Sequence, residues 1–386
     1  MNTNAREYLN SIRPSREMID QFTQESPERQ NELEKVMCNN AHSTFDAELG
    51  WVLRSGIRAG GVDGSKGVFV YEADGARRVI NSRDRPCRIH SYGDSFTHCD
   101  QVSDGETWQE FLAAHLQEPI RNFGIGGFSV YQAYRRMELI ESDGGAEYVI
   151  LNIYDDDHFR NLDTWRSIRK GNVGRFTLPH LKVDLENATV TEVDNPCRTR
   201  EDVYRLLDPD YIWETFKDDP VLHAALARRA EAEDKVTFNS AAARAFGRSG
   251  SALTNAESDA QLDELCTDAA LFASQYVVEQ AKSFLEKRGK QLILLLSFSR
   301  STIVADLEGK PRFDQTFLDW LQGQDFPWFD ARTVFREDFA SYKGSIKEFL
   351  DRYYIGHHTP AGNFLMAWAI KDLVCSWLDP KPLPYV

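Results

Sequence analysis

The chain has 386 residues, enough for one large domain with additions or for two domains, and its 42% hydrophobic and 27% charged residues exclude a wholly disordered or fibrous protein. A formal net charge of −15, without a Lys and Arg stripe interleaved with aromatic residues, argues against nucleic acid as a partner. The sequence has no apolar signal segment and no run of roughly 18 apolar residues, so we expect a cytoplasmic protein that does not bind a membrane.

Residues 1–80 are expected to form an N-terminal leader whose helices pack on a core. Apolar residues recur there at loose helical spacing in a charged background, which predicts one or two surface helices. They are Tyr8, Ile12, Ile19, Phe22, Leu33, Val36 and Met37.

Residues 81–386 are assigned to one α/β domain. Short apolar segments predict five strands of a parallel sheet, at 87–92, 120–123, 148–154, 291–298 and within 325–330. Amphipathic stretches lie between most of these segments, and a last helix is expected over 360–378, before Pro380. This alternation is typical of βα units around a parallel sheet.

A stretch of about a hundred residues, 160–258, interrupts the βα rhythm and is interpreted as an insertion. It contains a predicted hairpin over 181–193, a helix-prone run over 221–245 and a flexible stretch at 248–251. Insertions at the carboxyl ends of parallel strands lie beside the ligand sites of such folds. We therefore expect this one to form a lid or a substrate wall.

The segment Gly93-Asp94-Ser95-Phe96-Thr97 lies between the first predicted strand and a predicted helix. A tight glycine turn at that place exposes a serine hydroxyl at a strand end with backbone N–H groups nearby, which is what a nucleophilic serine needs. The same residues also make an ordinary turn and helix cap, so the tripeptide alone does not decide between the two interpretations.

Three segments, in order along the chain, resemble the motif blocks of the SGNH (GDSL-type) hydrolases. Residues 93–97 resemble the first block, 122–127 (Asn-Phe-Gly-Ile-Gly-Gly) the second, and 357–362 (His-His-Thr-Pro-Ala-Gly) the last. Residues 46–51 also resemble a segment that precedes the first block in one branch of the class. The resemblance covers about residues 44–160 and 290–378 and leaves the leader and the insertion outside it.

The resemblance implies a flavodoxin-like, three-layer α/β/α sandwich with a parallel sheet of about five strands. It also implies cofactor-free ester chemistry through an acyl-enzyme on Ser95, with a small-molecule ester as the partner. In this interpretation His357 is the catalytic base and His358 the fallback, and the N–H groups of Ser95 and Gly127 form the oxyanion hole.

Two positions depart from the pattern of the class. An asparagine is expected two residues after the end of the third strand, where this chain has Asp156. An aspartate is expected two or three residues before the histidine, where the chain has Ile355 and Tyr354.

A Ser–His dyad would still work without the second of these acids. A carboxylate from elsewhere could orient His357, and the candidates are Asp351, Asp157 and Glu348.

The run Asp155-Asp156-Asp157-His158, together with His98 and the histidine pair at 357 and 358, also permits a metal site. Consecutive residues on an extended segment point to opposite sides, so only some of these side chains could converge on one ion. We therefore expect no metal, and we assign His158 and His358 to substrate binding.

The leading hypothesis is a serine esterase or deacetylase that acts on a small acyl or O-acetyl ester, which could be linked to a carbohydrate. The alternatives are an acyltransferase that uses the same acyl-enzyme but excludes water, and a non-catalytic binding module on a degenerate scaffold. Retention of both Ser95 and His357 argues against the binding module.

The first prediction concerns Asp156. Two unit charges about 4 Å apart interact by roughly 4 kcal/mol at an effective dielectric near 20, so an ionised carboxylate aimed at the oxyanion would slow the reaction about a thousandfold. We expect Asp156 to turn away and serve His357 or an ion, so that Asp156→Asn lowers turnover of the native substrate. Faster hydrolysis of generic esters at neutral pH, with no substrate lost, would contradict a dedicated role.

Overall fold

The computed structural model describes residues 2–24, 43–172, 176–248 and 259–386. Leu33, Val36, Met37 and nearly all of the predicted flexible stretch at 248–251 lie outside these ranges. The described residues form two compact units. The first takes residues 2–24, 43–52 and 158–277, and the second takes 53–157 and 278–386.

The second unit is built on a five-stranded sheet in which every strand pairs in parallel, as expected. Its order is β11-β10-β7-β5-β6. When the five strands are numbered 1 to 5 along the chain and the sheet is read from β6 to β11, the order is 2-1-3-4-5. The strands are β5 (Ile89–Tyr92), β6 (Ile120–Asn122), β7 (Tyr148–Tyr154), β10 (Gln291–Ser297) and β11 (Trp328–Asp330).

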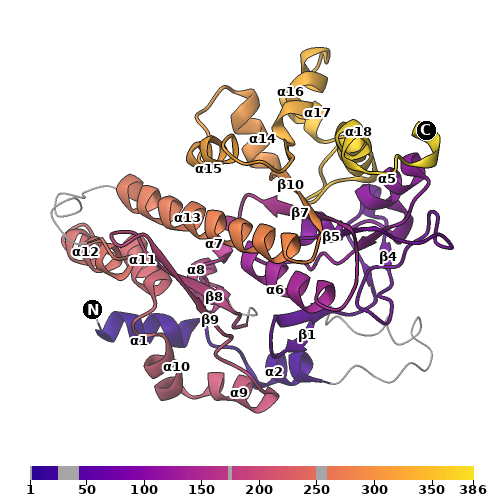
Figure 1. The fold of residues 1–386 in the computed structure, drawn as a ribbon. Helices are drawn as coiled ribbons and strands as arrows, with labels where there is room; N and C mark the ends of the chain where they lie inside the picture. The colour runs from indigo at the N-terminus through magenta and orange to yellow at the C-terminus, as the bar shows by residue number, and fades with distance from the viewer. Residues whose placement is uncertain (1, 25–42, 173–175, 249–258) are drawn as a thin grey trace. The chain divides into compact units, whose positions relative to one another are not determined.

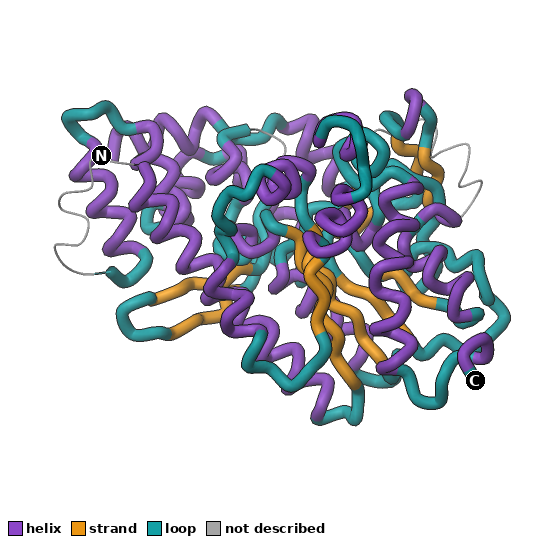
Figure 2. Tube along the Cα trace, turned by 90° about the horizontal axis from the view of Figure 1, so that it is seen from above, coloured by secondary structure: helices purple, strands orange, loops and turns teal. Residues whose placement is uncertain are grey.

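The central strands of this sheet are buried along nearly their whole length, as their apolar sequences predict. Helices cover both faces (Figures 1 and 2). On one face α5 packs against α18, and on the other α6 contacts the last turns of α13 through Tyr134 and Phe284, whose rings lie 6.2 Å apart. The fold is therefore the expected three-layer α/β/α arrangement.

The helices of the second unit are α4 (Ser95–His98), α5 (Trp108–Leu116), α6 (Val130–Glu141), α14 (Arg300–Leu307), α15 (Gln315–Leu321), α16 (Arg332–Ala340), α17 (Ile346–Leu350) and α18 (Pro360–Trp377). The antiparallel pair β3 (Gly56–Arg58) and β4 (Gly67–Phe69) also belongs to it. The 28-residue helix α13 (Asp259–Glu286) begins in the first unit and ends in the second.

The first unit combines the N-terminal helices with the stretch interpreted as an insertion. Helix α1 (Asn2–Ser11) contacts α10 (Pro209–Phe216) and α11 (Pro220–Arg229), and α2 (Arg16–Thr23) contacts α9 (Arg200–Tyr204). The expected leader of residues 1–80 is thus divided: its helices join the inserted residues, and residues 53–80 join the sheet-containing unit.

The remaining elements of the first unit include the strand pair β1 (Ser43–Asp46) and β2 (Gly50–Leu53). Leu53, the last residue of β2, belongs to the second unit. The predicted hairpin is present as β8 (His180–Asp184) and β9 (Thr189–Val193). The helix-prone run 221–245 contains two helices, α11 and α12 (Lys235–Ala245). Short helices α7 (Asp157–Arg160) and α8 (Arg166–Lys170) precede the hairpin.

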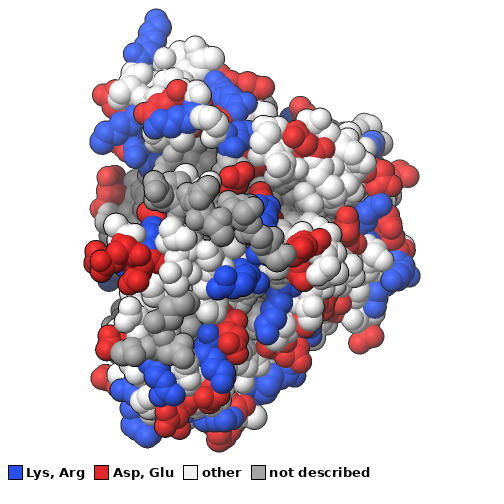
Figure 3. All heavy atoms as spheres, turned by 90° about the vertical axis from the view of Figure 1, so that its left-hand side faces the viewer, with Lys and Arg blue, Asp and Glu red and all other residues white. Residues whose placement is uncertain are grey.

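One face of the molecule shows how the charged side chains are distributed. On the face drawn in Figure 3, acidic and basic side chains of the described residues are intermingled.

In the described part of the chain, no helix combines the length and the apolar character that crossing a bilayer requires.

The packing between the loop after β6 and helix α4 generates the second prediction. A Cβ atom on Gly124 would lie 2.3 Å from the His98 backbone nitrogen and 2.7 Å from Thr97, whereas a Cβ on the exposed Gly105 would meet no atom within 4 Å. We expect Gly124→Ala to lower the free energy of unfolding by about 2–3 kcal/mol and Gly105→Ala to change it by less than about 0.5 kcal/mol. Urea unfolding followed by near-UV circular dichroism measures both, and equal effects would contradict this account of the packing.

Candidate active site

Ser95 lies at the carboxyl end of β5, on the first turn of the short helix α4. Asp94 caps that helix, because its Oδ1 accepts a hydrogen bond of 2.8 Å from the Phe96 N–H. Gly93 has φ of +151°, and a Cβ on it would lie 2.2 Å from Thr97 Oγ1 and 2.4 Å from the Asn152 carbonyl oxygen. Only glycine fits here, where the chain changes direction sharply between the carboxyl end of β5 and helix α4.

The second motif segment packs directly on α4. The Asn122 amide donates to the Thr97 carbonyl at 2.8 Å and accepts from the Gly124 N–H at 2.9 Å. A Cβ on Gly126 would lie 3.9 Å from Ser95 Cβ, so this glycine is the neighbour of the serine. Gly127 follows with φ of +85° and is partly exposed. Its predicted oxyanion role stays a prediction.

His357, from the last motif segment, contacts Ser95. Its Nε2 lies 2.9 Å from Ser95 Oγ, although 262 positions separate the two residues in the chain. The histidine lies in a tight turn in which the Ile355 N–H donates to the His357 carbonyl at 2.9 Å. The next residues begin α18, with Thr359 as the N-cap that accepts from the Gly362 N–H at 3.0 Å.

The other side of the His357 ring contacts a residue that the sequence did not indicate. Gln101 Oε1 lies 2.9 Å from His357 Nδ1 and accepts the His357 backbone N–H at 3.1 Å. Gln101 lies outside the motif segments, and 256 positions separate it from His357. The sequence therefore carried no signal for this contact.

The proposed orienting acids have other partners. Asp351 is exposed and pairs with Arg300 and Lys347, each at 2.6 Å. Asp157 accepts the Tyr154 N–H at 3.0 Å, which closes the turn after β7. The exposed Glu348 caps α17, where it accepts from Ser345.

The three aspartates after β7 are not interchangeable. Asp155 is buried and accepts from the Ser299 N–H at 2.9 Å and the Thr302 hydroxyl at 2.6 Å, so it fixes the start of α14. Asp156 lies in the turn and is partly exposed, and its assigned catalytic role stays a prediction. Within the described ranges no three His, Cys, Asp or Glu side chains form a cluster suited to a metal ion.

The histidines assigned to substrate binding are both buried. His158 belongs to the first unit, where its Nδ1 lies 2.7 Å from Ser274 Oγ. His358 is 3% exposed, and its ring centroid lies 5.0 Å from that of Phe96 and 4.9 Å from that of Tyr354. His358 thus lies in an aromatic cluster beside Phe96, and the substrate-binding role assigned to both histidines stays a prediction.

Burial keeps two histidines of this region neutral. It lowers the pKa of His358 to about 3, and the charge of the neighbouring His357 acts in the same direction. The pKa of His98 is also lowered to about 3, first by burial and then by the charge of Arg77. Neither ring can take up a proton near neutral pH without a large cost to the fold.

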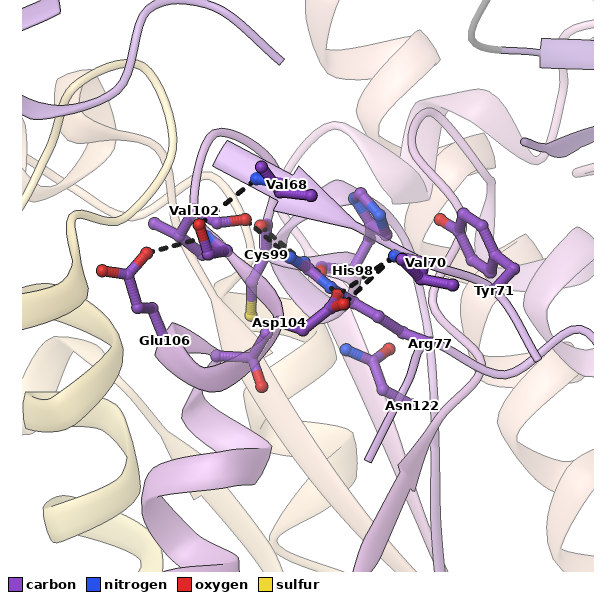
Figure 4. Close-up of polar contacts among 12 residues, drawn as sticks. Val68, Val70, Tyr71, Arg77, His98, Cys99, Val102, Asp104, Glu106 and Asn122 are labelled. Carbon is purple, nitrogen blue, oxygen red and sulfur yellow. Dashed lines mark hydrogen bonds and ion pairs between the residues drawn. The ribbon is translucent and has the colours of Figure 1, made fainter. Parts of the chain in front are cut away.

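The loop from His98 to Asp104 is held by one buried guanidinium (Figure 4). Arg77 donates from Nε to Asp104 Oδ1 at 2.8 Å, and its two terminal nitrogens donate to the carbonyl oxygens of His98, Cys99 and Val102 at 2.5–3.0 Å. The arginine is 1% exposed. Gln101 lies within the loop that this arginine fixes.

Taken together, these contacts place a serine hydroxyl, an imidazole and an amide oxygen in one hydrogen-bonded series. Ser95 is 8% exposed, and no acceptor among the described residues takes its backbone N–H. The arrangement can remove a proton from the hydroxyl and offer a backbone donor to a developing oxyanion.

No family model matches the sequence, and no curated protein does. One matching solved structure is that of "a putative lipolytic protein of G-D-S-L family from Desulfitobacterium hafniense DCB-2"; it is 11% identical and aligns over 75% of this chain and 99% of that chain, with a TM-score of 0.36.

The buried histidines generate the third prediction. Because the pKa of His358 is lower in the folded chain than the ordinary value of 6.5, the unfolded chain binds more protons between about pH 6.5 and 3. The contribution of the neutral His358 to the free energy of unfolding is therefore fully present above pH 6.5 and is lost as the pH falls toward 3. We expect His358→Phe to reduce this loss by about 0.7 kcal/mol between pH 7 and 6 and by about 1.2 kcal/mol between pH 6 and 5, measured by urea unfolding at pH 7, 6 and 5. An unchanged slope would show that His358 is not held neutral by the fold.

Proposed function

We propose that this chain is a serine esterase or deacetylase that cleaves a small acyl or O-acetyl ester, with Ser95 as the nucleophile and His357 as the base. The observation that carries the proposal is the 2.9 Å contact between His357 Nε2 and Ser95 Oγ at the end of a parallel strand. Hydroxyl and imidazole at this separation are the pair that acyl transfer through a serine ester requires.

The chemistry follows from these positions. Ser95 Oγ attacks the ester carbonyl carbon while His357 Nε2 accepts the hydroxyl proton. The tetrahedral oxyanion is stabilised by the Ser95 N–H and, according to the resemblance, by the N–H of Gly127. Collapse expels the alcohol, which takes the proton from His357 and leaves an acyl ester on Ser95. Water then attacks this ester by the same route, with His357 again as base, and releases the acid.

The fourth prediction tests the nucleophile. A fluorophosphonate probe should label Ser95 alone among the serines, as located by peptide mass spectrometry. Ser95→Ala should abolish both this labelling and the hydrolysis of short p-nitrophenyl esters, because it removes the hydroxyl that the base His357 contacts. Labelling that survives in Ser95→Ala would overturn the assignment.

The same assays separate the two neighbouring histidines. His357→Ala should lower turnover by about a thousandfold or more, because the serine then keeps its proton. His358→Ala should have a much smaller effect on turnover, since its ring packs against Phe96 and is not hydrogen-bonded to the Ser95 hydroxyl. The reverse ranking would assign the base to His358.

A further inference from the structure

The side chain of Gln101 occupies a tight socket beside the candidate base. Its Nε2 donates to the Gly60 carbonyl at 2.7 Å and to the Ile355 carbonyl at 3.3 Å. A Cβ on Gly356 would lie 2.8 Å from Oε1, and a Cβ on Gly60 would lie 3.3 Å from Nε2. Both glycines have positive φ, +117° and +86°, so larger residues are disfavoured on both sides of the amide.

These contacts determine which way the amide faces. The backbone N–H of His357 can only donate and the Gly60 carbonyl can only accept, so Oε1 must face His357 and Nε2 must face Gly60. His357 Nδ1 therefore faces an acceptor and carries the proton. Its Nε2 is then unprotonated and can accept the proton of the Ser95 hydroxyl.

The backbone of Gln101 is held in a conformation that a glutamine rarely adopts. Its φ is +74°, and Cys99, two residues earlier, has φ of +61°. Arg77 binds the carbonyl groups on both sides, at Cys99 and Val102, and so keeps this part of the loop in place (Figure 4). Left-handed non-glycine residues that the surrounding structure holds in place occur preferentially at functional sites.

From these three observations we propose that Gln101 is the positioning residue of the Ser95–His357 pair, a neutral amide that fixes the ring and the tautomer of the base. The inference rests on the proposed function. Gln101 does not contact the serine and acts through His357 alone. In the usual triad a carboxylate holds this position and also stabilises the protonated imidazole. Here the acceptor is uncharged, so the site orients its base without a charge in contact with Nδ1.

The fifth prediction uses three substitutions at one position. Gln101→Ala removes the acceptor. Gln101→Asn suits the left-handed backbone better than glutamine does but is one methylene too short to reach His357. Gln101→Glu keeps the reach and adds a charge, and it also replaces the donor that faces the Gly60 and Ile355 carbonyls with an oxygen. Gln117→Ala is the matched control, because Gln117 is an exposed glutamine with φ of +53° on α5's C-terminal cap.

Hydrolysis of p-nitrophenyl acetate and the rate of fluorophosphonate labelling should fall about a hundredfold in Gln101→Ala and Gln101→Asn. KM should stay within about twofold, since the proposed role of Gln101 is to position His357 and not to bind the substrate. Gln101→Glu should recover activity to within about tenfold. Its carboxylate favours the protonated imidazole, so the acid limb of the pH profile of kcat/KM should move upward by about one pH unit. Gln117→Ala should match the parent.

Parent-like turnover in a folded Gln101→Asn variant, or an unmoved acid limb in Gln101→Glu, would overturn the inference. Thermal melting verifies folding, and Gln101→Asn tests the role even where Gln101→Ala fails to fold. The proposed function fails separately: if Ser95→Ala keeps full activity, the site itself is misassigned. If Ser95→Ala is inactive and Gln101→Asn is fully active, only the positioning role is wrong.

Discussion

The position of the candidate nucleophile depends on the hydrogen bonds that hold Thr97. Helix α4 has only four residues, too few to be stable on its own. Neighbouring elements fix it instead: the Thr97 carbonyl accepts from Gln109 and Asn122, each at 2.8 Å, and its hydroxyl accepts from Asn152 at 3.0 Å. These donors come from α5, β6 and β7, so three parts of the α/β core converge on the helix that presents Ser95.

The parts of the molecule that could be predicted from the sequence are those encoded locally. Strand β7 has the predicted limits, 148–154, because a continuous apolar run between polar residues is itself the signal for a buried strand. Helix α18 begins at Pro360 as expected, because proline favours the first helical turn. The Gly-Asp-Ser turn was recognisable because its glycine and serine are close together in the chain.

Contacts between distant segments could not be predicted in this way. Gln101 lies in a loop without periodicity, and nothing in its own sequence connects it with His357. The division of residues 1–80 between two units is of the same kind, because surface-helix periodicity tells which face is apolar but not which partner covers it. The acidic run after β7 looked like one chemical group, yet Asp155 and Asp157 each satisfy a different backbone N–H. The neutral amide beside the base also has a charged neighbour: burial raises the pKa of Asp100, but the charges of His357 and of Arg58, which pairs with it at 3.3 Å, act against burial, and the pKa is lowered overall.

The pairing of the N-terminal helices with residues 200–229 has a consequence for how the chain folds as it is synthesised. Helix α1 ends at Ser11, whereas its partner α10 begins at Pro209, about 200 residues later. At roughly 5–20 residues per second, a ribosome needs about 10–40 seconds to make the intervening chain. During that time the side chains of Leu9 and Ile19, which are buried in the finished protein, lack the surface that covers them. Helices α1 and α2 therefore reach their final packing only after residues 200–229 have been synthesised.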